Sequence, residues 1–175
     1  MKKILFYFAI IGWIISVFVF VFSLLGVDVE DKLPFTWILH IGIFAVWAPT
    51  VYYLWRNPEL REYRFSLSNI IDFFKIIFKQ TPLWLIILAA VSFVCPLFVV
   101  FSPLFDFYGI AGVVDGQYVL HNHGIIIKTL TEQEYHSYFA REFAGFSGMW
   151  MAFYGVASAL LYPWSKRPNK NNIGD

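Results

Sequence analysis

Four long apolar runs, separated by segments that carry the charges, constrain the fold of this chain more than any other feature. The runs cover residues 4–26, 35–55, 83–105 and 146–164, and none of them contains Asp, Glu, Lys or Arg. A helix that crosses a bilayer needs about 20 mostly apolar residues, because each residue advances it by about 1.5 Å through a core of about 30 Å. We therefore expect an all-α membrane protein, a single domain built as a bundle of four transmembrane helices.

The composition is typical of a chain surrounded by lipid. Of the 175 residues, 59% are hydrophobic and 14% are charged, whereas about a quarter of the residues in a soluble domain are charged. The formal net charge of +1 provides no strongly basic surface, so no nucleic-acid partner is expected. The single cysteine, Cys95, excludes an internal disulfide and a CxxC pair.

The basic residues fall mostly on one side of the predicted bundle. Ten of the thirteen Lys and Arg residues lie there, namely Lys2, Lys3, Arg56, Arg61, Arg64, Lys75, Lys79, Lys166, Arg167 and Lys170. Lys and Arg are enriched in the cytoplasmic segments of membrane proteins. We therefore expect a multi-pass protein of the cell membrane with both termini in the cytoplasm. The short loops and compact size favour a bacterial inner membrane.

The predicted cytoplasmic loop contains an amphipathic segment at residues 66–79. Its polar residues recur every three or four positions, which predicts a helix with one polar face and a wide apolar face. Ser66 or Ser68 can cap its first turn. Such a helix either lies in the interfacial region of the membrane or packs against the bundle as an elbow.

The extracytoplasmic segment at residues 106–145 is long enough for a small folded unit. Residues 117–120 and 125–129 have the composition of strands and are separated by His121, Asn122, His123 and Gly124. We expect a β-hairpin built on a type I turn, in which Gly124 adopts a positive φ.

A helix is predicted after the hairpin. Thr131 and Glu134 match a capping box, so the helix is expected to run from about Glu132 to Ala144. A two-stranded hairpin is marginally stable alone, and we expect it to lie over this helix and the ends of the spans. The residues expected to contact a partner are His121, Asn122, His123, Gly124, Tyr135 and Tyr138.

Three histidines of this unit raise the question of a metal site. His121 and His123 flank the turn, and His136 lies four positions after Glu132, on the same helix face. Zinc binds imidazole and carboxylate ligands with such local spacings. However, polar residues are common in exposed turns, and no HExxH or Cys/His pattern is present. We expect no metal or other cofactor.

Two features of the predicted spans point to packing. The fourth run carries small residues at spacings of four, three and four, namely Gly148, Ala152, Gly155 and Ala159. Such a stripe lets helices approach closely, and we expect it to pack within the bundle, with docking of another membrane protein as the alternative. His40 is ionisable and lies in the second run, where we expect it to donate a structural hydrogen bond.

The chain carries no GxSxG, P-loop, dinucleotide-binding, kinase or deaminase motif, so an enzyme is not favoured. In layout it resembles the immunity proteins that protect bacteria from pore-forming toxins, which are small, cross the membrane four times and keep both ends inside. The resemblance implies a non-enzymatic protein that binds a membrane or extracytoplasmic protein, as an immunity-type protein or an accessory subunit of a membrane complex. The alternatives are a small homo-oligomeric transporter or channel and a metal-using membrane enzyme.

Overall fold

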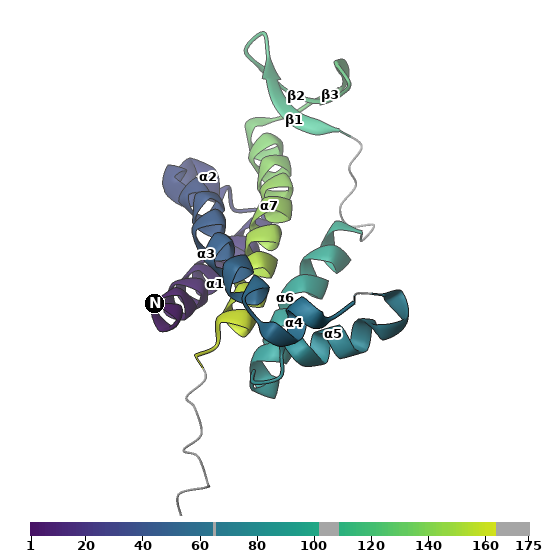
Figure 1. The fold of residues 1–175 in the computed structure, drawn as a ribbon. Coiled ribbons are helices and arrows are strands. Elements are labelled where there is room, and N and C mark those ends of the chain that lie inside the picture. The colour runs from purple at the N-terminus through teal and green to yellow at the C-terminus, as the bar shows by residue number, and fades with distance from the viewer. Residues whose placement is uncertain (65, 102–108, 164–175) are drawn as a thin grey trace, which may run out of the picture.

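The computed structural model describes residues 1–64, 66–101 and 109–163, and these are mostly helical (Figure 1). Three helical segments are long and apolar enough to cross a membrane. They are α1 (Lys2–Leu24), the segment Pro34–Trp55, which consists of the 3-10 helix η1 (Pro34–Trp37) and α3 (Ile38–Trp55), and α7 (Glu132–Leu161). A fourth apolar helix, α6 (Leu83–Val100), is shorter, and residues 102–105 of the third predicted span lie outside the described residues. Their length and composition indicate a membrane-associated protein.

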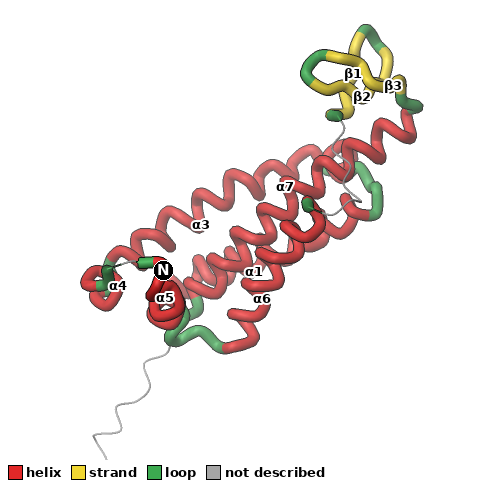
Figure 2. The backbone as a smooth tube through the Cα atoms, turned by 90° about the vertical axis from the view of Figure 1, so that its right-hand side faces the viewer, coloured by secondary structure: helices red, strands yellow, loops and turns green. Residues whose placement is uncertain are grey.

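The helix α7 lies at the centre of the bundle, because α1, α3 and α6 all pack against it. Figure 2 shows the four helices running lengthwise beside one another. A small sheet lies at one end, which we call the sheet end, and α4 (Pro58–Glu62) and α5 (Ile70–Ile77) lie at the other, which we call the loop end.

One tyrosine of α7 connects three helices. The Tyr154 hydroxyl donates a hydrogen bond of 2.8 Å to the Leu39 carbonyl at the start of α3. Its ring fills space left open by Gly12 of α1, where an added Cβ would lie 2.6 Å from the Tyr154 Cε1 atom. At Gly42 of α3 an added Cβ would overlap the Tyr154 hydroxyl. The two glycines therefore allow α1 and α3 to approach α7 around a fully buried aromatic side chain.

Several buried hydroxyl groups within the bundle bond to their own helices. Ser16 donates to the carbonyl of Gly12, and Thr50 to that of Val46, each at 2.7 Å. A polar group without a partner in an apolar environment costs several kcal/mol, so these bonds make serine and threonine tolerable there. The Ser92 hydroxyl, like that of Tyr154, bonds between helices instead, since it accepts from the Trp13 indole at 2.8 Å.

The sheet has three strands, whereas the sequence predicted two. It is antiparallel with the order β1 (Ile110–Val114), β2 (Gln117–Asn122) and β3 (Ile125–Thr129). The first strand was missed, although Asp115-Gly116 after it is a strong hairpin signal. Both residues have positive φ, 49° and 77°, as a type I′ turn requires.

The second turn also differs in type from the prediction. Gly124 has the expected positive φ of 84°, but His123 has a φ of 48° as well. Two consecutive positive φ values are typical of a type I′ turn rather than a type I turn, because its twist matches that of the flanking strands. The strand β2 therefore continues to Asn122, and the connection has two residues instead of four.

The outer helix and the fourth apolar run form one helix. Glu132–Ala144 and 146–164 were predicted as separate elements, but α7 continues from Glu132 to Leu161. Gly145 lies between them without breaking the helix, because a single glycine costs only about 1 kcal/mol relative to alanine and retains its backbone N–H. The predicted capping box is present, since the Thr131 hydroxyl accepts from the Glu134 backbone N–H and the Glu134 side chain accepts from the Thr131 N–H.

The predicted helix at residues 66–79 is shorter than expected. It comprises a 3-10 turn, η2 (Leu67–Asn69), followed by α5, and Ser66 forms a capping box with Asn69. The helix α5 presents the exposed side chains of Ile71 and Phe74, while Phe78, just after it, packs against the core of the bundle. It thus combines features of both expected arrangements, an apolar face that is open to the surroundings and an end packed on the bundle.

Candidate functional site

The sheet is attached to the first turns of α7 by an apolar cluster. Ala111 of β1, Leu120 of β2 and Leu130 are buried together, and Tyr118, Tyr135 and Tyr138 pack around them. The rings of Tyr118 and Tyr135 are 4.6 Å apart, centroid to centroid. Tyr135 and Tyr138, predicted to contact a partner, therefore lie between the helix and the sheet and are only partly exposed.

Two polar contacts fix the sheet relative to α7. The backbone N–H of Ala111 donates a hydrogen bond of 2.8 Å to Glu142 Oε1, which ties β1 to the helix. Lys128 of β3 forms a salt bridge of 2.6 Å with Glu134, in the first turn of α7. The hydrogen bond from Lys128 and those from Thr131 lower the pKa of Glu134 to about 2. The same bond to Glu134 raises the pKa of Lys128 above its ordinary value.

The four residues at the second turn that were predicted to contact a partner fall into two groups. His121 is partly exposed and lies against β1, since a Cβ added to Gly112 would be 2.8 Å from its Nε2 atom. Asn122, His123 and Gly124 are exposed around the turn. A Cβ added to Gly124 would meet nothing within 4 Å. The turn is therefore an open surface, whereas His121 belongs to the body of the sheet.

Three consecutive exposed apolar residues of the sheet were not among those predicted to contact a partner. Ile125, Ile126 and Ile127 are 72%, 52% and 50% exposed, and they lie in β3, a strand at the edge of the sheet. Side chains alternate between the two faces of a strand, so both faces of β3 are apolar and accessible. The three consecutive isoleucines were a signal in the sequence, because a strand with only one packed face cannot bury all three.

The three histidines considered for a metal do not share a site. His136 Nδ1 lies 2.8 Å from Asp28 Oδ2, in the connection between α1 and η1, whereas His123 is in the turn and His121 lies against β1. Within residues 1–64, 66–101 and 109–163, no three His, Cys, Asp or Glu side chains are grouped so that they could hold a metal ion. The His136–Asp28 pair instead fastens α7 to the short helix α2 (Val29–Lys32), which Asp28 caps.

His40 was expected to donate a hydrogen bond, but in the structure it accepts one. The Trp150 indole Nε1 lies 3.0 Å from His40 Nδ1. An indole N–H can only donate, so Nδ1 is the acceptor and is not protonated in this arrangement. Trp150 is fully buried, and Trp37, Phe143 and His40 pack edge-on against its ring. His40 therefore satisfies a buried donor between α3 and α7.

The small-residue stripe of α7 faces α1 and α6. A Cβ added at Gly148 would lie 2.7 Å from the Pro96 Cβ of α6, and one at Gly155 would lie 2.8 Å from the Ser92 Cβ. Ala159 is fully buried. Three of the four positions thus lie at contacts inside the chain.

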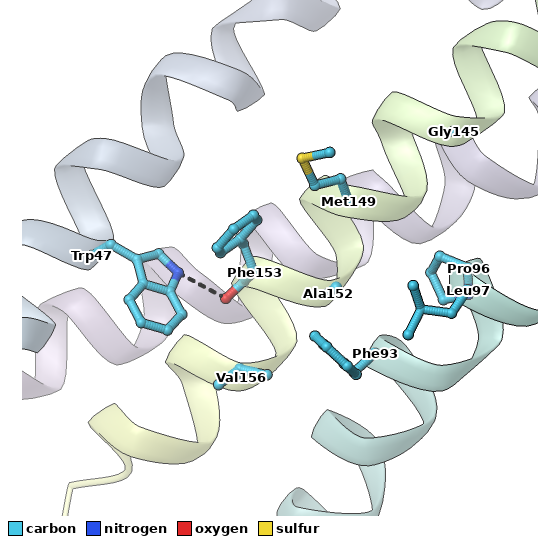
Figure 3. Close-up of a pocket in the computed structure, with 9 residues that line it drawn as sticks. All are labelled: Trp47, Phe93, Pro96, Leu97, Gly145, Met149, Ala152, Phe153 and Val156. Atoms are coloured by element: carbon cyan, nitrogen blue, oxygen red, sulfur yellow. Dashed lines mark hydrogen bonds between the residues drawn. The ribbon is translucent and has the colours of Figure 1, made fainter. Parts of the chain in front are cut away.

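The fourth position, Ala152, lies at the floor of an apolar groove between α3 and α6. The groove has a volume of about 350 Å³, and Figure 3 shows Trp47 on one side and Phe93 and Leu97 on the other. The Trp47 indole donates a hydrogen bond of 3.1 Å to the Phe153 carbonyl of α7, which holds that wall in place. The lining is almost entirely apolar, so the groove offers a contact surface rather than a reactive site.

Comparisons with protein-family models, with curated proteins and with solved structures find no match to this chain.

Proposed function

We propose that this chain is a non-enzymatic, multi-pass membrane protein that acts by binding another protein through its sheet. The observation that carries the proposal is the edge strand β3, with three exposed isoleucines. An edge strand offers backbone N–H and C=O groups to an extended segment of a partner. Contiguous exposed apolar residues are typical of interaction sites.

In this proposal α6 is the fourth membrane span. Its 18 residues correspond to a length of about 27 Å at about 1.5 Å per residue, close to the hydrocarbon thickness of about 30 Å. It lies lengthwise against α7 (Figure 2). Only the part of α7 after about Gly145 lies within the membrane, since the turns before it carry Arg141 and several acidic residues.

The proposed topology places the loop end in the cytoplasm and the sheet end outside. It is supported by the basic residues, because Lys2 and Lys3 begin α1 at the loop end and Arg56 and Arg61 lie at the end of α3 and in α4. A bacterial inner membrane remains the proposed location. An immunity-type protein or an accessory subunit of a membrane complex would use such an exposed sheet to reach a membrane or extracytoplasmic partner.

The test is affinity capture from gentle detergent with mass spectrometry of the co-purifying proteins. Two variants are compared with the wild type, the double substitution Ile125→Thr/Ile127→Thr in β3 and Val113→Thr in β1. Threonine keeps the β propensity and removes apolar surface. Val113 is 56% exposed at the opposite edge of the sheet and provides the matched control.

We expect the wild type and Val113→Thr to capture one stoichiometric protein. The double variant should recover at least about tenfold less of it, since each large apolar side chain contributes about 1.5–3 kcal/mol when fully buried. Equal recovery by all three proteins would show that β3 is not the binding site. A wild type that purifies only as a homo-oligomer would contradict the proposal and favour the transporter or channel, for which ion flux in liposomes is the next measurement.

A further inference from the structure

A polar cavity of about 180 Å³ lies at the loop end of the bundle, away from the sheet. It is enclosed by the first residue of α1, the end of α3, the segment from α4 to α6 and the end of α7. Its lining residues are Lys2, Thr50, Tyr53, Leu54, Asn57, Glu59, Ile76, Ile77, Lys79, Gln80, Thr81, Leu160 and Tyr162. Most of the lining surface is polar, in contrast to the groove between α3 and α6.

Among the described residues that line the cavity, one positive charge is unpaired. Lys79 Nζ lies 2.7 Å from Glu59 Oε1, so these two side chains neutralise each other. Lys2 is half-buried, and its ammonium group has no hydrogen bond or ion pair with any residue in the described ranges. Among the described residues that line the cavity, Glu59 is the only acid and is already paired, so none of them supplies Lys2 with a counter-ion.

Neutral donors accompany Lys2. Asn57 Oδ1 accepts from the Glu59 backbone N–H at 3.0 Å, which leaves the Asn57 amide NH₂ available. Gln80 and the Tyr53 hydroxyl likewise have no hydrogen-bond partner within residues 1–64, 66–101 and 109–163. The Thr81 hydroxyl, in contrast, donates to the Ala159 carbonyl at 2.9 Å. One cation and several free donors around a cavity match a group that is anionic and rich in acceptor oxygens.

We propose that this cavity binds the phosphate-bearing headgroup of an anionic phospholipid. In the proposed topology α1 crosses the membrane, so a cavity at its first residue lies at the level of the headgroups. Ile76 and Ile77 of α5, together with Leu160 of α7, form an apolar wall that suits the glycerol and the first acyl carbons. A zwitterionic headgroup fits less well, because the Glu59 carboxylate, which could receive its ammonium group, already pairs with Lys79.

The experiment measures lipid binding to the purified full chain in neutral detergent, by native mass spectrometry and by the midpoint of thermal unfolding. The added probes are phosphatidylglycerol, phosphatidylcholine and inorganic phosphate. Lys2→Gln removes the unpaired charge. Lys3→Gln is the matched control, because Lys3 is adjacent and exposed but does not line the cavity. Gln80→Leu removes a neutral donor without changing the charge.

We expect the wild type and Lys3→Gln to retain one phosphatidylglycerol and to unfold at a higher temperature when it is added. Lys2→Gln should bind it roughly tenfold more weakly and Gln80→Leu a few-fold more weakly, in line with the loss of one charged or one neutral contact. Equal losses in Lys2→Gln and Lys3→Gln would indicate diffuse attraction to the anionic surface and overturn the proposal. Equal binding of phosphatidylcholine, or a shift produced by inorganic phosphate alone, would overturn it as well.

Discussion

Trp150 and His40, which are 110 residues apart in the chain, form a hydrogen bond between two helices, with the indole of α7 donating to the imidazole of α3. The donor is fully buried, so its partner cannot be replaced by water at low cost. The same pair lies within a cluster of aromatic rings that includes Trp37 and Phe143. The bond thus aligns α3 with α7 near the sheet end.

The first prediction concerns this bond. His40→Leu should destabilise the protein by about 1–3 kcal/mol, because the Trp150 N–H would be buried without an acceptor. His40→Asn should recover much of the loss, since its side-chain oxygen can replace Nδ1 as the acceptor. Unfolding in mixed micelles of increasing denaturing detergent measures both. Equal stability of the two variants would show that the hydrogen bond is not the reason for the effect.

A second prediction concerns the packing around Tyr154. Gly12→Ala should destabilise the bundle by about 1–3 kcal/mol, because the new Cβ would lie 2.6 Å from the tyrosine ring. Gly145→Ala is the control. It also lies within a helix, but its added Cβ would meet nothing within 4 Å, so it should be neutral or stabilising by up to about 1 kcal/mol. The midpoints of thermal unfolding in detergent would separate the two variants.

A third prediction tests how Tyr154 and Gly42 depend on each other. Gly42→Ala should destabilise the wild type strongly, since the methyl group would overlap the Tyr154 hydroxyl. Tyr154→Phe alone should also destabilise the protein, because the Leu39 carbonyl loses its donor. In this background Gly42→Ala should cost less than in the wild type, because the hydroxyl that the methyl group would overlap is gone. Stability measurements on the four proteins form a double-mutant cycle. A coupling free energy near zero would contradict the contact.

The fourth prediction concerns pH at the corner between β3 and α7. The folded pKa of Glu134 is lowered from 4.5 to about 2. The contribution of its carboxylate to stability is therefore present above about pH 4.5 and is lost as the pH falls through about 2. Carbon-13 NMR of the Glu134 carboxyl should follow this titration. Lys128→Met should raise the pKa back toward its ordinary value, and an unchanged titration in this variant would refute the pairing with Lys128.

A fifth prediction tests the proposed topology. In a Cys95→Ser background, Gln117→Cys in β2 should react with a membrane-impermeant maleimide added to intact cells, since this position is exposed at the sheet end. Arg61→Cys in α4, exposed at the loop end, should react only after the cells are permeabilised. The opposite pattern would invert the orientation, and labelling of both in intact cells would rule out a membrane between the two ends.

The sequence predicted the apolar helices because a charge-free run of about 20 residues has few other structures. It also predicted the capping box at Thr131, which depends on residues three positions apart. It did not predict β1, because Ala111 and Gly112 within Ile110–Val114 are of types depleted in strands, although the Asp115-Gly116 turn was a signal for the hairpin. Nor could it show that Tyr154 lies between Gly12 and Gly42, since contacts more than 100 residues apart leave no local pattern.

The cavity at the loop end was missed for a related reason. Lys2, Asn57 and Gln80 belong to separate segments of the chain, and only the packing of α1, α3 and α6 on α7 brings them together. The role of His40 was expected in part. Its position near one end of an apolar run indicated a structural hydrogen bond, but the direction of that bond depends on a tryptophan far away in the chain.

The continuity of α7 has a mechanical consequence. The helix runs without a break from the turn that holds the sheet to the far end of the bundle, a length of about 45 Å at about 1.5 Å per residue. The same helix contacts α1, α3 and α6. A force applied at β3 would therefore rotate or tilt α7 as a unit, and would displace the surface against which the other three helices pack.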